Sequence, residues 1–162
     1  RASSAAVGTP VETYLHSRGI NLVAPDAVRF HPHLKHPSGG TWPGMIALVA
    51  RGHDGESLAI HRTFLARDGA GKAPVTPQKM MLGPCRGGVV RLALPVGKLM
   101  IGEGIETCLA AMQATCRPAW AALSTTGEMP PPAKDIATGA AHEQVTDSIN
   151  REEQYRYTKV QT

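Results

Sequence analysis

Two glutamates at a strand-to-helix junction are the residues whose types and spacing best suit chemistry. A short apolar run, residues 99–101, is followed by Gly102-Glu103-Gly104, and Glu106 comes three residues after Glu103. Glycines at such a junction allow a sharp turn and the close approach of a ligand. A carboxylate there suits a Mg²⁺ ion, which prefers oxygen ligands, or a general acid or base. The alternative is that both glutamates stabilise a helix start through its macrodipole, and Glu106, in the first turn, fits this alternative better.

The segments around this junction predict a βαβ unit. Residues 98–104 (KLMIGEG) read as a strand, apolar residues at 105, 108, 109, 112 and 116 have helical spacing, and 117–127 (RPAWAALSTTG) read as extended. A strand, a helix and a strand within roughly 30 residues imply parallel pairing and a right-handed crossover. Ligands of such sheets bind at the carboxyl ends of the strands, and Glu103 lies at that end of the first strand.

The preceding residues predict a small, mostly antiparallel sheet over 40–95. The runs 45–51 and 58–66 form a hairpin around Asp54-Gly55, and two short strands follow within 79–84 and 87–95. Residues 67–78 (RDGAGKAPVTPQ) read as a mobile basic loop. Strand alternation places His61 and Arg62 on opposite faces, so at most one of them faces a ligand together with Arg67.

The regions before and after the sheet have different patterns. A short helix begins after Thr9, with Pro10 at its first position and Glu12 placed for a capping box, and Gly19 ends it. Residues 31–44 (HPHLKHPSGGTWPG), with three prolines and three glycines, read as a loop. The tail is polar, and a loose helix from about residue 147 to 157 and partial disorder are the alternatives there.

The charges are unevenly spread. The net charge is +4, with 12 Lys and Arg against 5 Asp and Glu in residues 1–100, and 5 against 8 in residues 101–162. This asymmetry predicts a basic surface for a polyanion beside an acidic site, and ordinary solvated charge is the alternative. Three cysteines without close spacing argue against a disulfide framework and favour a reducing, cytoplasmic location.

No membrane segment is expected, because no apolar run approaches the roughly 18 residues that a spanning helix needs. The start of the chain has no hydrophobic signal segment and no initiator Met, so we expect an excised or processed piece of a longer protein.

Several stretches resemble the Toprim primase-like proteins of phages, plasmids and integrated mobile genetic elements. They are GTPVETYLHSRGI, VRFHP, AIHRTFLARDGAGKA, LGPCRGGVVRLA, IGEGIETCLAA and PAWAALSTTG, and together they span about residues 8–127. The resemblance implies Mg²⁺-dependent nucleotidyl transfer (Mn²⁺ is the alternative ion) that makes RNA primers on single-stranded DNA for DNA replication. It implies nucleotides and single-stranded DNA as partners, with a replicative helicase or another host protein as a further one.

The resemblance also implies roles for individual residues. Glu103 matches the catalytic acid/base of the Toprim site and would be a metal ligand. The basic residues of the preceding sheet, Arg62, Arg67, Lys72 and Lys79, are the implied nucleic-acid contacts. The loop residues 69–72 lack the full Walker pattern, so a phosphate-backbone contact is the expectation for them.

The Toprim pattern is incomplete, because the Asp-x-Asp pair expected after the proline segment is not found. Asp135 and Asp147 are isolated there, and a single carboxylate cannot organise two-metal phosphoryl transfer. The chain alone is therefore expected to be inactive as a polymerase. The alternative function is a non-catalytic regulatory module that binds nucleic acid or a protein. His31, His33 and His36 lack the spacing of a zinc finger and read as loop residues.

Together these predictions give one expected architecture of the α/β class, α+β overall. A helix and loop (1–39) precede a basic antiparallel β region (40–95), a partial Toprim-like βαβ unit (96–132) and a polar tail (133–162).

Overall fold

The computed structural model describes residues 3–52, 54–123 and 158–160. The elements of these residues are β1 (Ser4–Ala5), α1 (Pro10–Ser17), β2 (Val28–Lys35), β3 (Thr41–Arg51), β4 (Ser57–Phe64), β5 (Lys79–Leu82), β6 (Gly88–Arg91), β7 (Met100–Gly102), α2 (Ile105–Thr115), β8 (Ala119–Ala122) and β9 (Thr158–Val160).

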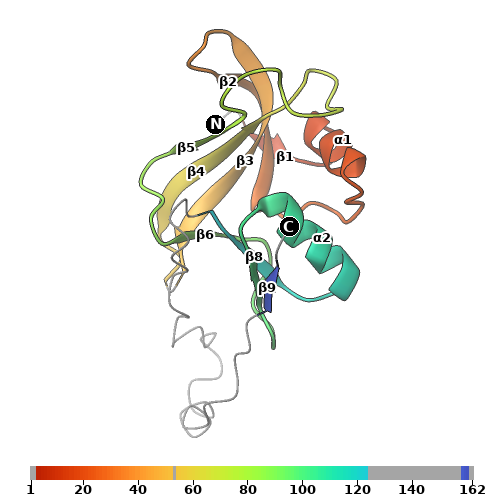
Figure 1. Cartoon of the computed structure of the whole chain (residues 1–162), viewed down its shortest axis with the longest axis vertical. Helices are drawn as coiled ribbons and strands as arrows, with labels where there is room; N and C mark the ends of the chain where they lie inside the picture. The colour runs from red at the N-terminus through yellow and green to blue at the C-terminus, as the bar shows by residue number, and fades with distance from the viewer. Residues whose placement is uncertain (1–2, 53, 124–157, 161–162) are drawn as a thin grey trace, which may run out of the picture.

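The strands form one continuous sheet (Figure 1). The order is β1-β2-β3-β6-β8-β7-β9, with β4 also paired to β3 and β5 paired to β4. All pairs are antiparallel except β7 with β8 and β7 with β9. The expected fold class, a mostly antiparallel sheet followed by a βαβ unit, is confirmed. The boundary expected near residue 95 falls between β6 and β7 within this sheet.

Gly88 allows the two parts of the sheet to meet. At the end of β3, Ala50 pairs both with Ser57 of β4 and with Val89 of β6, and Arg51 pairs with Gly88 of β6. A Cβ atom at Gly88 would lie 2.5 Å from Cγ1 of Val49, closer than van der Waals contact allows. A glycine is therefore required where β6 pairs with β3.

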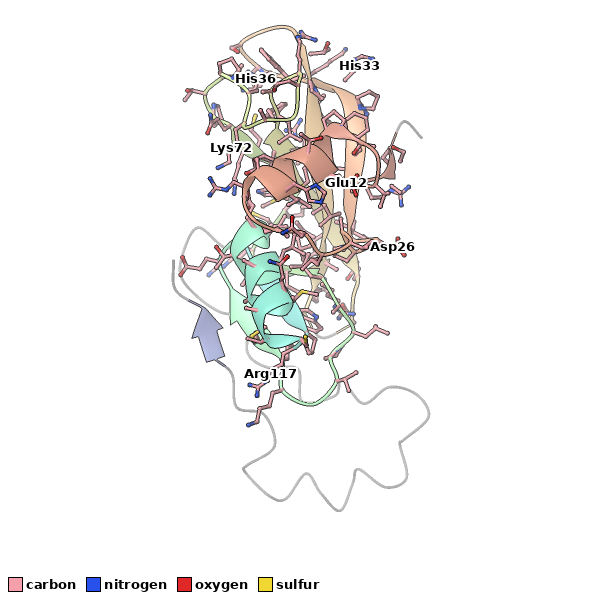
Figure 2. The ribbon with its side chains drawn as sticks, turned by 90° about the vertical axis from the view of Figure 1, so that its right-hand side faces the viewer. Glu12, Asp26, His33, His36, Lys72 and Arg117 are labelled. Atoms are coloured by element: carbon pink, nitrogen blue, oxygen red, sulfur yellow. The ribbon has the colours of Figure 1, made fainter. Side chains whose placement is uncertain are left out.

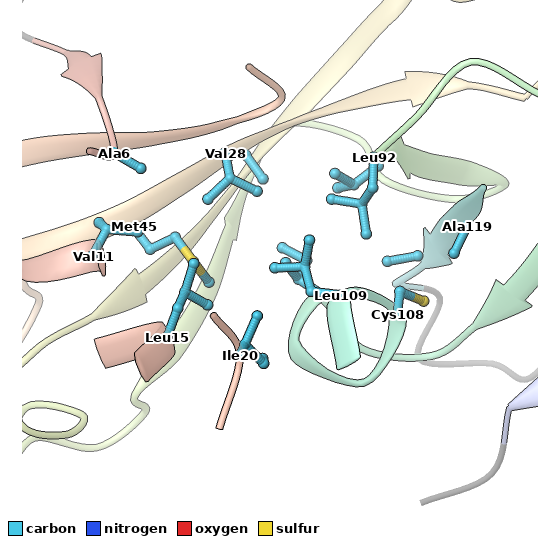
Figure 3. Packing of buried hydrophobic residues seen from close by; sticks show 14 of the residues in the cluster. Ala6, Val11, Leu15, Ile20, Val28, Met45, Leu92, Cys108, Leu109 and Ala119 are labelled. Atoms are coloured by element: carbon cyan, nitrogen blue, oxygen red, sulfur yellow. The ribbon is translucent and has the colours of Figure 1, made fainter. Parts of the chain in front are cut away.

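Both helices pack on the same face of the sheet and bury one core (Figures 1 and 3). Tyr14 and Leu15 of α1 and Cys108 and Leu109 of α2 are each at most 1% exposed. Burial of such side chains contributes roughly 1.5–3 kcal/mol each for the large apolar ones, so this shared core holds α1 and α2 against the sheet. The opposite face carries two smaller clusters, one around Trp120 and one around Phe64.

The N-terminal helix forms as its capping residues predict. Thr9 is the N-cap, and its hydroxyl accepts a hydrogen bond from the amide of Val11 at 3.3 Å. Glu12 accepts from the amide of Gly8 at 2.9 Å instead of closing the capping box onto Thr9. Gly19 follows the helix with φ of +75°, the left-handed conformation that suits glycine after a helix end.

The loop predicted for residues 31–44 is wrong, because this segment is a hairpin. β2 extends to Lys35, β3 begins at Thr41, and Gly39 and Gly40 turn between them with positive φ. The register shifts between His31 and Leu34, so the irregular step contains Pro32, which has no N–H to donate. Pro32 thus lies at a bulge, Pro37 lies in the turn, and neither prevents the two strands from pairing.

The hairpin around Gly55 and the βαβ unit were predicted correctly, whereas β9 was not. Gly55 has φ of +78°, and the register joins Met100 to Ala119 in parallel. In the tail, β9 pairs in parallel with β7, but the helix predicted for 147–157 lies outside the described residues, as do Asp135 and Asp147. Among the described residues no helix is long and apolar enough to span a membrane.

Candidate functional site

A pocket opens where β7 ends and α2 begins. It has a volume of about 340 Å³, and its lining includes Glu103, Gly104, Lys79, His61 and Leu123. This is the carboxyl end of a parallel strand, where ligands of such sheets bind. Glu103 is exposed at the pocket, as expected from its place after β7. The structure thus brings together two residues predicted from the sequence, Glu103 and Lys79.

Gly104 serves the junction in a different way from the one expected. It is the N-cap of α2 with φ of −128° and ψ of 146°, an extended conformation that any residue can adopt. A Cβ atom there would meet nothing closer than 3.5 Å. The helix start has no side-chain cap, so the pocket is bordered by backbone amide groups at the positive end of α2.

Glu106 is the polar centre beneath this pocket. Its side chain is buried, accepts a hydrogen bond from the Tyr14 hydroxyl at 2.8 Å, and pairs with Nζ of Lys79 at 3.0 Å. The sequence analysis favoured a macrodipole role for Glu106 over a chemical one. Its partners come from α1 and β5, and the contact with Tyr14 joins residues 92 positions apart. The helical spacing that predicted α2 carries no signal for that contact.

The electrostatics of Tyr14 and Glu106 follow from burial and from their contact. Burial acts to raise the pKa of the Glu106 carboxyl, but the Lys79 ammonium and the hydrogen bonds that Glu106 accepts outweigh it, so the pKa is lowered. Burial and the Glu106 charge raise the pKa of Tyr14. Glu106 is therefore an ionised acceptor at neutral pH, and Tyr14 is its neutral donor.

His61 is a buried, neutral group at the edge of the same pocket. It is 6% exposed, and its Nδ1 atom has no hydrogen-bond partner among the described residues. Burial lowers the pKa of His61 to about 4, with help from the nearby Lys79 and Lys72 charges. The imidazole is thus uncharged at neutral pH and lies, with its Nδ1 atom buried, against a pocket whose lining includes Lys79 and Glu103.

Three cations lie close to one another near the buried Glu106 carboxylate. The pKa of Lys72 is lowered by partial burial and by the charges of Lys79 and Arg18, while Glu106 acts in the opposite direction. Figure 2 shows Lys72 beside α1. We call Arg18, Lys72 and Lys79 the basic cluster. Because these three positive charges outnumber the Glu106 charge beside them, this side of the molecule attracts anions.

The loop that carries Lys72 is held in place rather than open. Leu65 and Lys72 form a β-bridge, and the amide of Ala66 donates to the carbonyl of Gly71 at 2.9 Å. Gly69, with φ of +73°, lies so close to α1 that a Cβ atom would be 2.8 Å from the carbonyl oxygen of Pro10. The mobile loop expected for 67–78 is therefore a fixed turn at this end, packed on α1.

The other two predicted nucleic-acid contacts lie away from the pocket. Arg62 points to the opposite face from His61, as alternation predicts, with its guanidinium carbon 5.9 Å from the Phe64 ring centroid. Arg67 lies 5.1 Å from the Trp42 ring centroid and donates to the carbonyl of Thr41 at 3.3 Å. These cation–π contacts occupy both guanidinium groups with structural partners.

The described residues do not fit a Mg²⁺ site by themselves. Within them no group of three His, Cys, Asp or Glu side chains is arranged to hold a metal. Glu106 is already paired with Lys79, which leaves Glu103 as the one carboxylate that lines the pocket. His36 also has structural partners, because its ring nitrogens bond Ser38 at 2.6 Å and the Pro77 carbonyl at 3.1 Å.

Comparisons with known proteins give a family and a distant structural neighbour. A family profile described as a domain of unknown function, DUF7146, matches residues 1–92, which end just after β6. No curated protein matches the sequence. The chain is similar to a solved structure of the DnaG primase catalytic domain bound to single-stranded DNA, with a TM-score of 0.46 and 16% identity. The match covers 74% of this chain and 49% of that chain, so this chain spans about half its length.

Proposed function

The chain belongs to the DUF7146 family, and for this member we propose a module that binds single-stranded nucleic acid through phosphate contacts at the basic cluster. One observation carries the proposal. Lys79 lines the pocket at the end of β7, and the charges of Lys79 and Arg18 both help to lower the pKa of Lys72, so the three cations lie close together beside that pocket. Glu106 pairs with Lys79, and a phosphodiester backbone would supply an anion for the remaining positive charge of the basic cluster.

We further propose that an intact primase-like protein containing this chain would be catalytic. In such a protein the pocket at the end of β7 would face the growing primer, and Glu103 would act as the acid/base in Mg²⁺-dependent nucleotidyl transfer. Carboxylates from outside the described residues would have to complete the metal ligands, because Glu106 is held by Tyr14 and Lys79. A non-catalytic binding module is the second candidate, and the engagement of Glu106 favours it.

The test of binding is a salt titration with a fluorescent single-stranded oligonucleotide. Affinity of the wild type should fall steeply between about 50 and 200 mM salt, as counterion release requires. Lys72→Gln should weaken binding and reduce the salt slope by about one, since it removes one phosphate contact. Lys98→Gln, which removes the same charge at the opposite end of β7, is the matched control and should leave affinity and slope unchanged.

Two outcomes separate the candidates. A flat salt curve, or equal losses for Lys72→Gln and Lys98→Gln, would remove the basic cluster as the binding site. A Mn²⁺ titration of the wild type and of Glu103→Gln tests catalysis, because the primase proposal requires metal binding that weakens in the variant. Equal metal binding by both proteins, with normal oligonucleotide affinity, would leave the non-catalytic module.

A further inference from the structure

An apolar groove lies at the C-terminal end of α2, away from the pocket described above. It has a volume of about 530 Å³ and is lined by residues of three segments, including Leu22, Leu94, Val96, Met112, Gln113 and Arg117. We call this hollow the α2-end groove. Leu22 and Met112 also pack against the core, but Leu94, Val96 and Arg117 do not belong to it, so the composition of the groove needs a separate explanation.

The side chains at the groove are more exposed than apolar side chains usually are. Leu94 is 81% exposed and Val96 is 76% exposed, and Val23, next to Leu22 in the chain, is 78% exposed. Single exposed apolar residues are ordinary, but a group of them around one hollow marks an interaction site. Keeping these side chains in water costs free energy that docking of an apolar partner would recover.

Both walls of the groove are fixed by hydrogen bonds from side chains. Gln113 Oε1 accepts from the amides of Asn21 and Leu22 at 2.6 and 3.1 Å, and its Nε2 donates to the carbonyl of Gly19 at 2.9 Å. On the other wall, Nε1 of Trp120 donates to the carbonyl of Ala93 at 2.9 Å. A groove with fixed walls loses little conformational entropy on binding, which favours its use as a preformed site.

Positive charge lies at one end of the groove, because Arg117 lines it and Lys98 follows the lining residue Val96 by two positions in the chain. Met100 pairs with Ala119 in the parallel register, and the amide of Met100 donates to the carbonyl of Pro118 at 2.9 Å. Arg117 precedes this paired segment, Lys98 lies two residues before Met100, and Figure 2 shows Arg117 at the end of α2. Both side chains are exposed, and neither forms an ion pair within the described part of the chain. Positive charge next to an apolar hollow is complemented by a partner with acidic residues beside apolar ones.

We propose that the α2-end groove docks an acidic amphipathic helix of a partner protein. A helix presents apolar anchors at i, i+3 or i+4 and i+7 to such a groove, with its carboxylates at the edges where they meet Arg117 and Lys98. The groove walls are loops and a helix end, so no strand edge is offered for β-addition. Trp120 uses its indole N–H inside the fold, and the groove lining contains no aromatic ring on which nucleobases would stack.

The test uses a fluorescent designed peptide of about 16 residues with leucines at helical spacing on one face and glutamates on the other. Two control peptides have the same length: one replaces every glutamate by lysine, and the other has the same composition with the leucine spacing scrambled. The protein variants are Leu94→Ser and Arg117→Glu in the full chain. The matched protein control is Val7→Ser, which removes an apolar side chain that is 57% exposed on another part of the molecule.

The wild type should bind the acidic helical peptide in preference to both control peptides. Leu94→Ser should weaken that binding about tenfold, as loss of a central apolar anchor does. Arg117→Glu should weaken it at low salt with a smaller effect at high salt. Val7→Ser should bind as the wild type does.

Several results would overturn the proposal. These are equal binding of the scrambled peptide, no effect of Leu94→Ser, and loss of oligonucleotide binding rather than peptide binding in that variant. Light scattering completes the test, because a wild-type dimer that Leu94→Ser converts to monomer would identify a second copy of the chain as the occupant.

Discussion

Removal of one hydroxyl group from Tyr14 tests whether the contact between α1 and α2 has the strength that the structure implies. Tyr14→Phe deletes the donor that lies 2.8 Å from Glu106 and leaves the ring, which is 1% exposed, in the core. A hydrogen bond to a charged group contributes about 1.5–3 kcal/mol, so we expect the free energy of unfolding to fall by about 2 kcal/mol. For a chain of this size that corresponds to a decrease in Tm of roughly 4–8 °C.

The pH dependence gives the same prediction a second readout. The raised pKa of Tyr14 means that the folded protein keeps the phenolic proton at a pH where the unfolded chain has lost it. Stability of the wild type should therefore decrease as the pH rises above about 10, the ordinary value for tyrosine. Tyr14→Phe lacks this proton, so its stability should decrease less over the same interval. Urea unfolding followed by tryptophan fluorescence at several pH values measures both effects.

Thr63→Val is the matched control for this experiment. Its hydroxyl is also buried, at 0% exposed, but Oγ1 has no hydrogen-bond partner among the described residues. Its removal should leave the free energy of unfolding unchanged or slightly raised, because an unsatisfied buried group is lost. Equal destabilisation by Tyr14→Phe and Thr63→Val, or parallel alkaline curves for wild type and Tyr14→Phe, would refute the role given to the Tyr14–Glu106 bond.

The remaining predictions concern His61 and the turn at Gly69. The pKa of His61 is lowered to about 4 in the folded protein, so the neutral imidazole favours folding at every pH above its ordinary pKa of about 6.5. This contribution, up to about 3 kcal/mol, should be lost as the pH falls from about 6.5 to about 4. His61→Gln should flatten the urea-unfolding stability curve over that interval, and an unchanged slope would contradict the burial of a neutral imidazole. Gly69→Ala should destabilise by about 2–3 kcal/mol, through its positive φ and the contact with Pro10. Gly87→Ala is the control, because Gly87 has φ of +71° and open space around it, and it should lower the free energy of unfolding by only about 1 kcal/mol. Equal decreases in Tm for Gly69→Ala and Gly87→Ala would mean that the loop at Gly69 does not pack tightly against α1.

Local patterns predicted the elements because local forces form them. The cap at Thr9, the turn at Gly55 and the spacing of α2 depend on residues close together in the sequence, and all three were predicted correctly. The prolines of 31–44 led to the wrong prediction of a loop. Pro32 is tolerated in β2 because the bulge between His31 and Leu34 leaves one N–H without a role in pairing, and that bulge depends on the neighbouring strand.

The site was less accessible to the sequence than the elements were. The glycine-flanked turn identified the place of Glu103, and the structure puts Lys79 in the same pocket. The roles of Tyr14, Glu106 and His61 depend on how α1 docks against the sheet and α2, which is a contact between distant parts of the chain. Periodicity predicts which face of a helix is buried, but it does not predict which polar group of another element contacts that face.

The strand order has a consequence for how the chain folds during synthesis. β8 lies between β6 and β7, yet it is made after both of them. On the ribosome, β6 and β7 therefore emerge without the strand that joins them, and the sheet stays divided until residues 119–122 have left the exit tunnel. At roughly 5–20 residues per second, the roughly 30 residues from β6 to β8 hold the nascent chain in this divided state for seconds. The exposed edges of β6 and β7 are then the surfaces that a chaperone would have to protect.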